Sequence, residues 1–123
     1  MKNQIAAAVL LVASAMGVQA DTPSPDDAEK LGRCHGIFAY IGFYKQTESL
    51  YRHVRDLTNN IDDSELAFAF AYSFGTGSGS YYEMLATLGE NSPTDAKARA
   101  LDLIDGKLCY RIVNSIDAGL DYE

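Results

Sequence analysis

Two cysteines, Cys34 and Cys109, have the most clearly defined chemistry in this chain of 123 residues. Thiols pair in an oxidising compartment, and two cysteines allow only one intramolecular disulfide. The bond would span 75 residues of sequence. Closing a loop of that length is expected to stabilise a small domain by roughly 4 to 5 kcal/mol. No metal-ligand spacing surrounds either cysteine, so we predict a disulfide and not a metal site.

The histidines and carboxylates give little support for catalysis. His35 and His53 would lie about 27 Å apart on one unbroken helix, too far to share a metal ion. His53 and Asp56 are three residues apart, a spacing that helices produce often by chance. Asp102 and Asp105 have basic neighbours and are typical of a solvated charged face. We therefore predict no catalytic residues, no metal and no cofactor.

A glycine-rich run at residues 75–79 is predicted to be a flexible loop. It lacks the lysine of a phosphate-binding loop, so we do not expect a nucleotide site. Loops carry binding function more often than helix faces do. The candidate partner-contact loop therefore comprises Gly75, Thr76, Gly77, Ser78 and Gly79, with Tyr81 and Tyr82 beside it.

Small residues repeat every fourth position near the start of the chain, at Ala28, Gly32 and Gly36. Each helical glycine costs about 1 kcal/mol relative to alanine, so a compensating contact is expected. We predict that this stripe is where a second helix approaches closely.

The first twenty residues have the features of a secretory signal peptide. Lys2 precedes an apolar run too short to span a bilayer, and Val18-Gln19-Ala20 fits the small-x-small rule for cleavage. We predict cleavage after Ala20, an extended leader over residues 21–25 and a single domain over residues 26–123. Export to the periplasm or the exterior would also provide the oxidising compartment that the disulfide needs.

The chain is acidic, with a net charge of −7 that becomes −8 when the predicted signal peptide, whose one charged residue is Lys2, is removed. Such a charge repels nucleic acids and anionic lipid surfaces. The expected partner is therefore another protein, and a basic one would suit this charge better. Nucleic acid is not expected as a partner, and no integral membrane segment is expected after cleavage.

The positioning elements are predicted to be helices. Ser24 offers a capping hydroxyl before Pro25, which suits a first helical position, and apolar residues then recur at three- and four-residue steps. This first helix either bends near Gly42 or restarts at Thr47. A polar turn then precedes another helix start at Asp62.

Residues 66–74 are ambiguous, because their aromatic residues alternate as in a strand while others step by four as in a helix. We favour the helix, since alanine is abundant and no turn signal interrupts the segment. A short helix is then predicted from Ser80 to Gly89, and a last continuous helix from Ser92 to near Gly119.

The predicted fold is therefore all-α, a bundle of four or five helices tied by the Cys34–Cys109 disulfide. Our first functional hypothesis is an exported, non-enzymatic interaction protein with the general character of small exported inhibitors and immunity proteins. The alternative is a carrier of a small apolar ligand or lipid, with a pocket between helices. These hypotheses predict different features, an aromatic or acidic surface patch in one case and a sizeable internal pocket in the other.

Overall fold

The computed structural model describes residues 24–119, and this part of the chain is all-α with five helices and no strand. The helices are α1 (Pro25–Ile41), α2 (Tyr44–Asn59), α3 (Ser64–Asn91), α4 (Pro93–Gly106) and α5 (Cys109–Asp117). The predicted signal peptide, its cleavage after Ala20 and most of the extended leader lie outside the described residues. None of the described helices is long and apolar enough to cross a membrane.

Helix α1 begins where the sequence predicts. The Ser24 side chain accepts a hydrogen bond from the backbone of Asp27, and the Asp27 carboxylate accepts one from the backbone of Ser24. Pro25 occupies the first turn, where its missing N–H costs nothing. The helix ends at Gly42, whose φ of 79° is accessible to glycine at little cost, and α2 begins at Tyr44 and not at Thr47.

Helix α3 corrects the prediction of a flexible glycine loop. Residues 75–79 are helical and lie in the middle of a continuous 28-residue helix. The helix preference of residues 66–74 is confirmed, but no separate helix starts at Ser80 and none stops at Gly89. Helix α3 also begins one residue later than predicted, because its N-cap is Asp63 and not Asp62. The Asp63 side chain accepts hydrogen bonds from the backbone N–H groups of Glu65 and Leu66.

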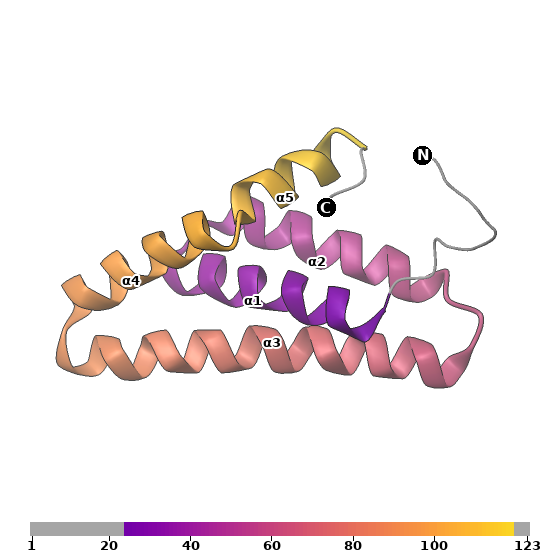
Figure 1. Ribbon diagram of the computed structural model, residues 1–123, viewed down its shortest axis with the longest axis horizontal. Coiled ribbons are helices and arrows are strands. Elements are labelled where there is room, and N and C mark those ends of the chain that lie inside the picture. Colours follow the sequence, from indigo (N-terminus) through magenta and orange to yellow (C-terminus); the bar gives the residue numbers. More distant parts are fainter. Residues whose placement is uncertain (1–23, 120–123) are drawn as a thin grey trace.

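The last predicted helix is in fact two helices. It breaks between Gly106 and Cys109, and Leu108 has a left-handed φ of 56°. This conformation costs a non-glycine residue roughly 1 to 2 kcal/mol. The turn allows α4 to pack on α3 while α5 continues away from α3 to lie beside α2 (Figure 1).

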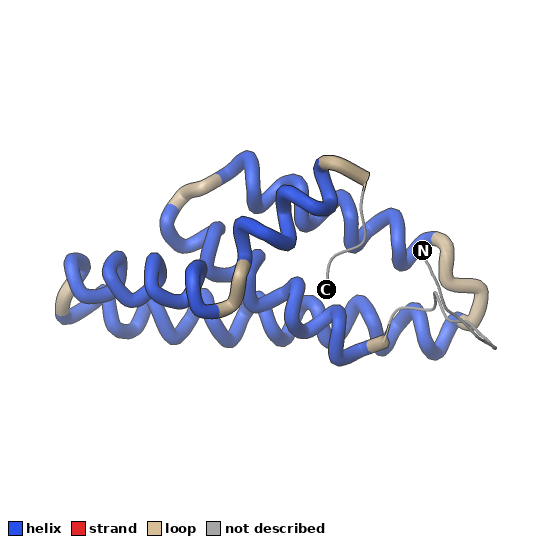
Figure 2. Tube along the Cα trace, turned by 45° about the horizontal axis from the view of Figure 1, so that its top comes forward, coloured by secondary structure: helices blue, strands red, loops and turns tan. Residues whose placement is uncertain are grey.

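Helix α1 lies between the other elements and holds the core together. Figure 1 shows α3 running along one side of the molecule, with α1 and α4 next to it and α2 and α5 beyond. Figure 2 shows the same arrangement after rotation, with α3 still forming one edge. The largest fully buried side chains are Phe38, Phe70, Leu31, Ile37, Leu50, Leu85 and Ile104.

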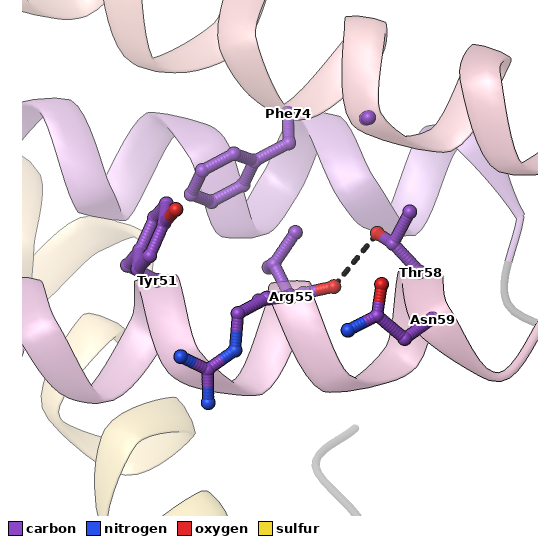
Figure 3. A pocket seen from close by; sticks show the side chains of 7 residues that line it. Tyr51, Arg55, Thr58, Asn59 and Phe74 are labelled. Carbon is purple, nitrogen blue, oxygen red and sulfur yellow. Dashed lines mark hydrogen bonds between the residues drawn. The ribbon is translucent and has the colours of Figure 1, made fainter.

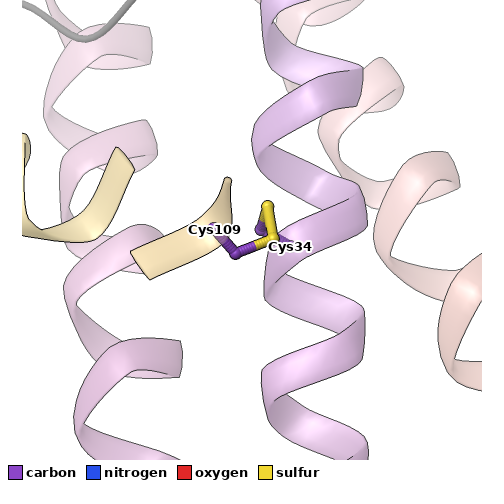
Figure 4. The surroundings of a disulfide bond; sticks show 2 residues. All are labelled: Cys34 and Cys109. Atoms are coloured by element: carbon purple, nitrogen blue, oxygen red, sulfur yellow. A yellow bond between two sulfur atoms is a disulfide. The ribbon is translucent and has the colours of Figure 1, made fainter. Parts of the chain in front are cut away.

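The predicted disulfide is present and ties α1 to the start of α5 (Figure 4). Cys34 and Cys109 are both fully buried, with Cα atoms 5.6 Å apart. Cys34 is two residues from both Gly32 and Gly36, so its side chain projects about 160° away from each of them at about 100° per residue. One side of α1 is therefore bonded covalently, and the other side packs on α3.

Candidate interaction surface

The inner face of α3 contacts α1 through glycines on both helices. A methyl group on Gly32 would overlap the carbonyl oxygen of Phe74, and one on Gly36 would overlap the carbonyl oxygen of Ser78. A methyl group on Gly77 would lie 2.6 Å from the carbonyl oxygen of Glu29. The backbones of the two helices are thus in direct contact, which only glycine allows.

This close contact explains why a glycine-rich segment is helical. Three glycines between residues 75 and 79 cost roughly 3 kcal/mol in helix propensity. Packing against α1 supplies dispersion contacts and apolar burial that outweigh this local preference. Ala28 is also fully buried, so all three residues of the predicted packing stripe lie in the interior.

His35 and Ser78 form a polar bridge at the same helix crossing. The His35 Nδ1 atom lies 2.8 Å from the Ser78 Oγ atom, and the imidazole ring lies 5.0 Å from the ring of Phe74. Burial lowers the pKa of His35 below its usual value of 6.5. The neutral imidazole is therefore favoured at this crossing.

A serine and a histidine in contact are two members of a possible nucleophilic dyad. Ser78, however, lies in the middle of α3, where backbone N–H groups are used in helix hydrogen bonds and cannot stabilise an oxyanion. We interpret the pair as an interhelical hydrogen bond that fixes the register of α1 on α3.

The residues of the predicted contact loop are divided between the two faces of α3. Gly77 and Ser78 face α1, and Tyr81 packs partly buried against the core, with Arg33 and Lys107 over its ring at 5.8 Å and 5.3 Å. The other members, Gly75, Thr76, Gly79 and Tyr82, are exposed. A β-carbon placed on Gly75 or Gly79 would have no neighbouring atom within 4 Å.

Two exposed aromatic residues, which were not among the predicted binding residues, lie on the same side of α3 as these exposed members. Phe68 is 71% exposed and Tyr72 is 63% exposed, and their rings stack with centroids 6.1 Å apart. Tyr82 is 46% exposed and is held by an edge contact with Tyr40. We use the term outer face of α3 for five residues: Phe68, Tyr72, Gly75, Gly79 and Tyr82.

The four-residue step between Phe68 and Tyr72 was the signal that could have revealed this face. Once residues 66–74 are taken as helical, Phe70 and Phe74 form one stripe, and Phe68 and Tyr72 form another that points the opposite way. The first stripe is buried and the second is exposed.

The outer face lies on a long uncharged stretch. Seventeen residues separate Glu65 from Glu83, and none of them is ionisable at neutral pH. Helix α3 has no lysine or arginine. An apolar face without charge is typical of a surface that another helix covers.

A hollow of about 280 Å³ lies between α2 and α3, with an apolar lining that includes Tyr51, Val54 and Phe74 (Figure 3). Thr58 and Asn59 border it, and the Thr58 hydroxyl donates to the carbonyl oxygen of Val54. Its volume is just below the range of ligand pockets, and it opens to solvent. This hollow is therefore smaller and more open than the internal pocket that the carrier hypothesis predicts.

A second hollow, of about 320 Å³, contains both members of the His53–Asp56 pair between α2 and α5. Burial lowers the pKa of His53, and the charge of Asp56 opposes that change. His35 and His53 line no common site, and no group of three or more metal-binding side chains occurs within residues 24–119.

Comparisons with known proteins find no match for this chain. No protein-family model matches the chain, and neither a curated protein nor a solved structure matches it. The class of the protein is thus defined by its architecture alone, as a small, disulfide-tied, all-α protein.

Proposed function

We propose that this chain is an exported, non-enzymatic module that binds another protein through the outer face of α3. The observation that carries the proposal is the stacked pair Phe68 and Tyr72, exposed on a stretch of helix without charge. Aromatic side chains are enriched in protein interfaces because they bury a large area at a low entropic cost.

The rigidity of the scaffold supports this proposal. The Cys34–Cys109 bond and the contact between α1 and α3 hold the outer face in place before any partner arrives. A pre-organised surface loses less conformational entropy on binding and so binds more tightly. The disulfide also fits the predicted export, and an inhibitor-like or immunity-like role stays a hypothesis within this proposal.

The proposal is tested by capture of partners from the envelope and the medium of the source organism with three forms of the oxidised protein. The wild type and a Tyr44→Ser variant should capture the same protein, because Tyr44 is 78% exposed but lies on α2, away from the outer face. A Phe68→Ser variant should lose it. Equal capture by all three forms would place the contact elsewhere, and a co-purifying lipid in place of a protein would favour the carrier.

A further inference from the structure

We infer that the partner of the outer face of α3 is a second copy of this chain, with the two α3 helices packed antiparallel and crossing between Gly75 and Gly79. This inference rests on the proposed function, because it names the partner of the same surface. The inference is supported by the spacing and the symmetry of the exposed residues, by the area that these residues would bury and by the distribution of charge.

The spacing is that of a coiled-coil seam. From Phe68 the outer residues follow at steps of four, three, four, three and four, through Tyr72, Gly75, Gly79 and Tyr82 to Ala86. Alternating steps of three and four place residues along one side of a helix that packs against another helix. The buried residues of α3 account for its inner face, and of this second seam only Tyr82 has a ring contact with another helix of the described chain, through Tyr40.

The seam is symmetric about residue 77. Gly75 and Gly79 are equally far from it, as are Tyr72 and Tyr82, and as are Phe68 and Ala86. In an antiparallel pair each glycine therefore faces a glycine of the other copy, each Tyr72 faces a Tyr82, and each Phe68 faces the small Ala86. A two-fold interface needs this self-complementarity, because both copies present the same patch.

The glycines give the pair a short distance between helix axes. Gly75 and Gly79 have open space where a side chain would project, so the helix backbone itself is accessible there. Two helical glycines with no contact in the folded chain cost stability without a local gain. Residues that break a local rule in this way are expected at functional sites.

The exposed aromatic side chains supply a substantial part of the area that a dimer needs. Aromatic rings bury about 150–250 Å² each, so covering the exposed parts of Phe68, Tyr72 and Tyr82 removes roughly 700 Å² from water over two copies. That is about half of the surface buried in a small stable interface, before the backbone and Ala86 are included.

Charge makes the inference distinguishable from binding to a basic protein. The residues of the seam are uncharged, but acidic residues lie beyond both of its ends, with Asp62, Asp63 and Glu65 at one end and Glu90 at the other. In an antiparallel pair the acidic end of one helix meets the acidic end of the other. Salt screens this repulsion, so self-association should strengthen with ionic strength, whereas binding to a basic partner should weaken.

The first test is sedimentation equilibrium of the oxidised protein in about 0.01 M and about 1 M salt, where the Debye length is about 30 Å and 3 Å. We expect a monomer–dimer equilibrium that shifts toward dimer at high salt. Gly79→Leu should weaken the dimer about tenfold or more, because the side chain fills the space that the second backbone needs. Gly106→Leu is the matched control, since Gly106 is equally open but lies on α4, and it should leave the dimer unchanged.

A second test fixes the orientation. Antiparallel pairing brings the two copies of Thr76 together beside the two-fold axis, so a Thr76→Cys variant should cross-link to itself with a short bis-maleimide. Thr94→Cys, at the exposed start of α4, should not cross-link.

A protein that is monomeric at every salt concentration would overturn the inference, as would a dimer that Gly79→Leu leaves intact or a failure of Thr76→Cys to cross-link. In each case the proposed function stands if Phe68→Ser still abolishes capture of a different protein. If neither self-association nor capture depends on the outer face, both proposals fail.

Discussion

The two faces of α3 use the same residue type for opposite purposes. On the inner face Gly77 lies against α1, and the space for a side chain is filled by the backbone of Glu29. On the outer face Gly75 and Gly79 have open space around them. Glycine on the inner face is thus explained by packing within the chain, and glycine on the outer face is explained only by something outside it.

Helix α1 also has two different sides, and it is held from both of them. The disulfide bonds one side of α1 to α5, and Gly32 and Gly36 pack on α3 at the other side. The unfolding free energy lost without the covalent bond can therefore be compared with the loss when the noncovalent contact is disturbed.

The largest effect is expected from removal of the disulfide. The double variant Cys34→Ala, Cys109→Ala should lose about 4 kcal/mol of unfolding free energy, because the unfolded chain regains the entropy of a long open loop. Urea denaturation of the variant and of the oxidised wild type measures the difference. A loss below that of the glycine variants described next would mean that α1 is held mainly by α3.

The next effect tests the inner face. Gly36→Ala should lose roughly 1 to 3 kcal/mol of unfolding free energy, since the methyl group meets the rigid backbone of Ser78 and outweighs the gain in helix propensity. Chemical denaturation measures it, with Gly106→Ala as a control at an open helical position. Stabilisation by Gly36→Ala would contradict direct backbone contact.

The outer face should respond in the opposite direction. Gly75→Ala should raise the unfolding free energy of the monomer by about 1 kcal/mol, because alanine favours the helix and its methyl group touches nothing. Denaturation at low protein concentration measures the monomer alone. A destabilised variant would show that the outer face already has a neighbour within the chain.

The smallest effect is a pH dependence that arises at the inner contact. Burial lowers the pKa of His35 in the folded protein, so the unfolded state binds a proton more readily. Stability should therefore be highest above pH 6.5 and fall as the pH drops from there toward the lower folded pKa of His35.

Denaturation at several pH values between about 5 and 8, where histidine is the side chain that titrates, measures this slope. A His35→Gln variant should show a shallower slope than the wild type. Some dependence should remain, because burial also lowers the pKa of His53. If the slope in the His35→Gln variant equals that of the wild type, His35 is not a source of the pH dependence.

The elements whose signals are local were predictable from sequence. Ser24 and Pro25 predicted the start of α1, and the two cysteines predicted the disulfide. The all-α class also followed from periodicity. These features depend on capping, on helical spacing and on the arithmetic of two thiols, which act over short stretches or allow one outcome only.

The features set by tertiary contact were not predictable in the same way. Residues 75–79 have the composition of a loop and are helical because α1 covers Gly77. The break at Leu108 has no glycine or proline at the residue with positive φ, and the one local signal near it is Gly106, the last residue of α4. The outer face was missed because Gly75, Gly79 and Tyr82 join Phe68 and Tyr72 on one side only when α3 is one continuous helix.

The most direct test of this account compares the unfolding free energies of Gly77→Ala and Gly79→Ala, two residues apart on α3, at a concentration where the protein is monomeric. The account predicts a loss of roughly 1 to 3 kcal/mol for Gly77→Ala, where the methyl group meets the backbone of α1. It predicts a gain of about 1 kcal/mol for Gly79→Ala, which lies in open space. If both variants have nearly the stability of the wild type, residues 75–79 behave as a flexible loop. That result would contradict both the close packing of the inner face and the helical, open outer face.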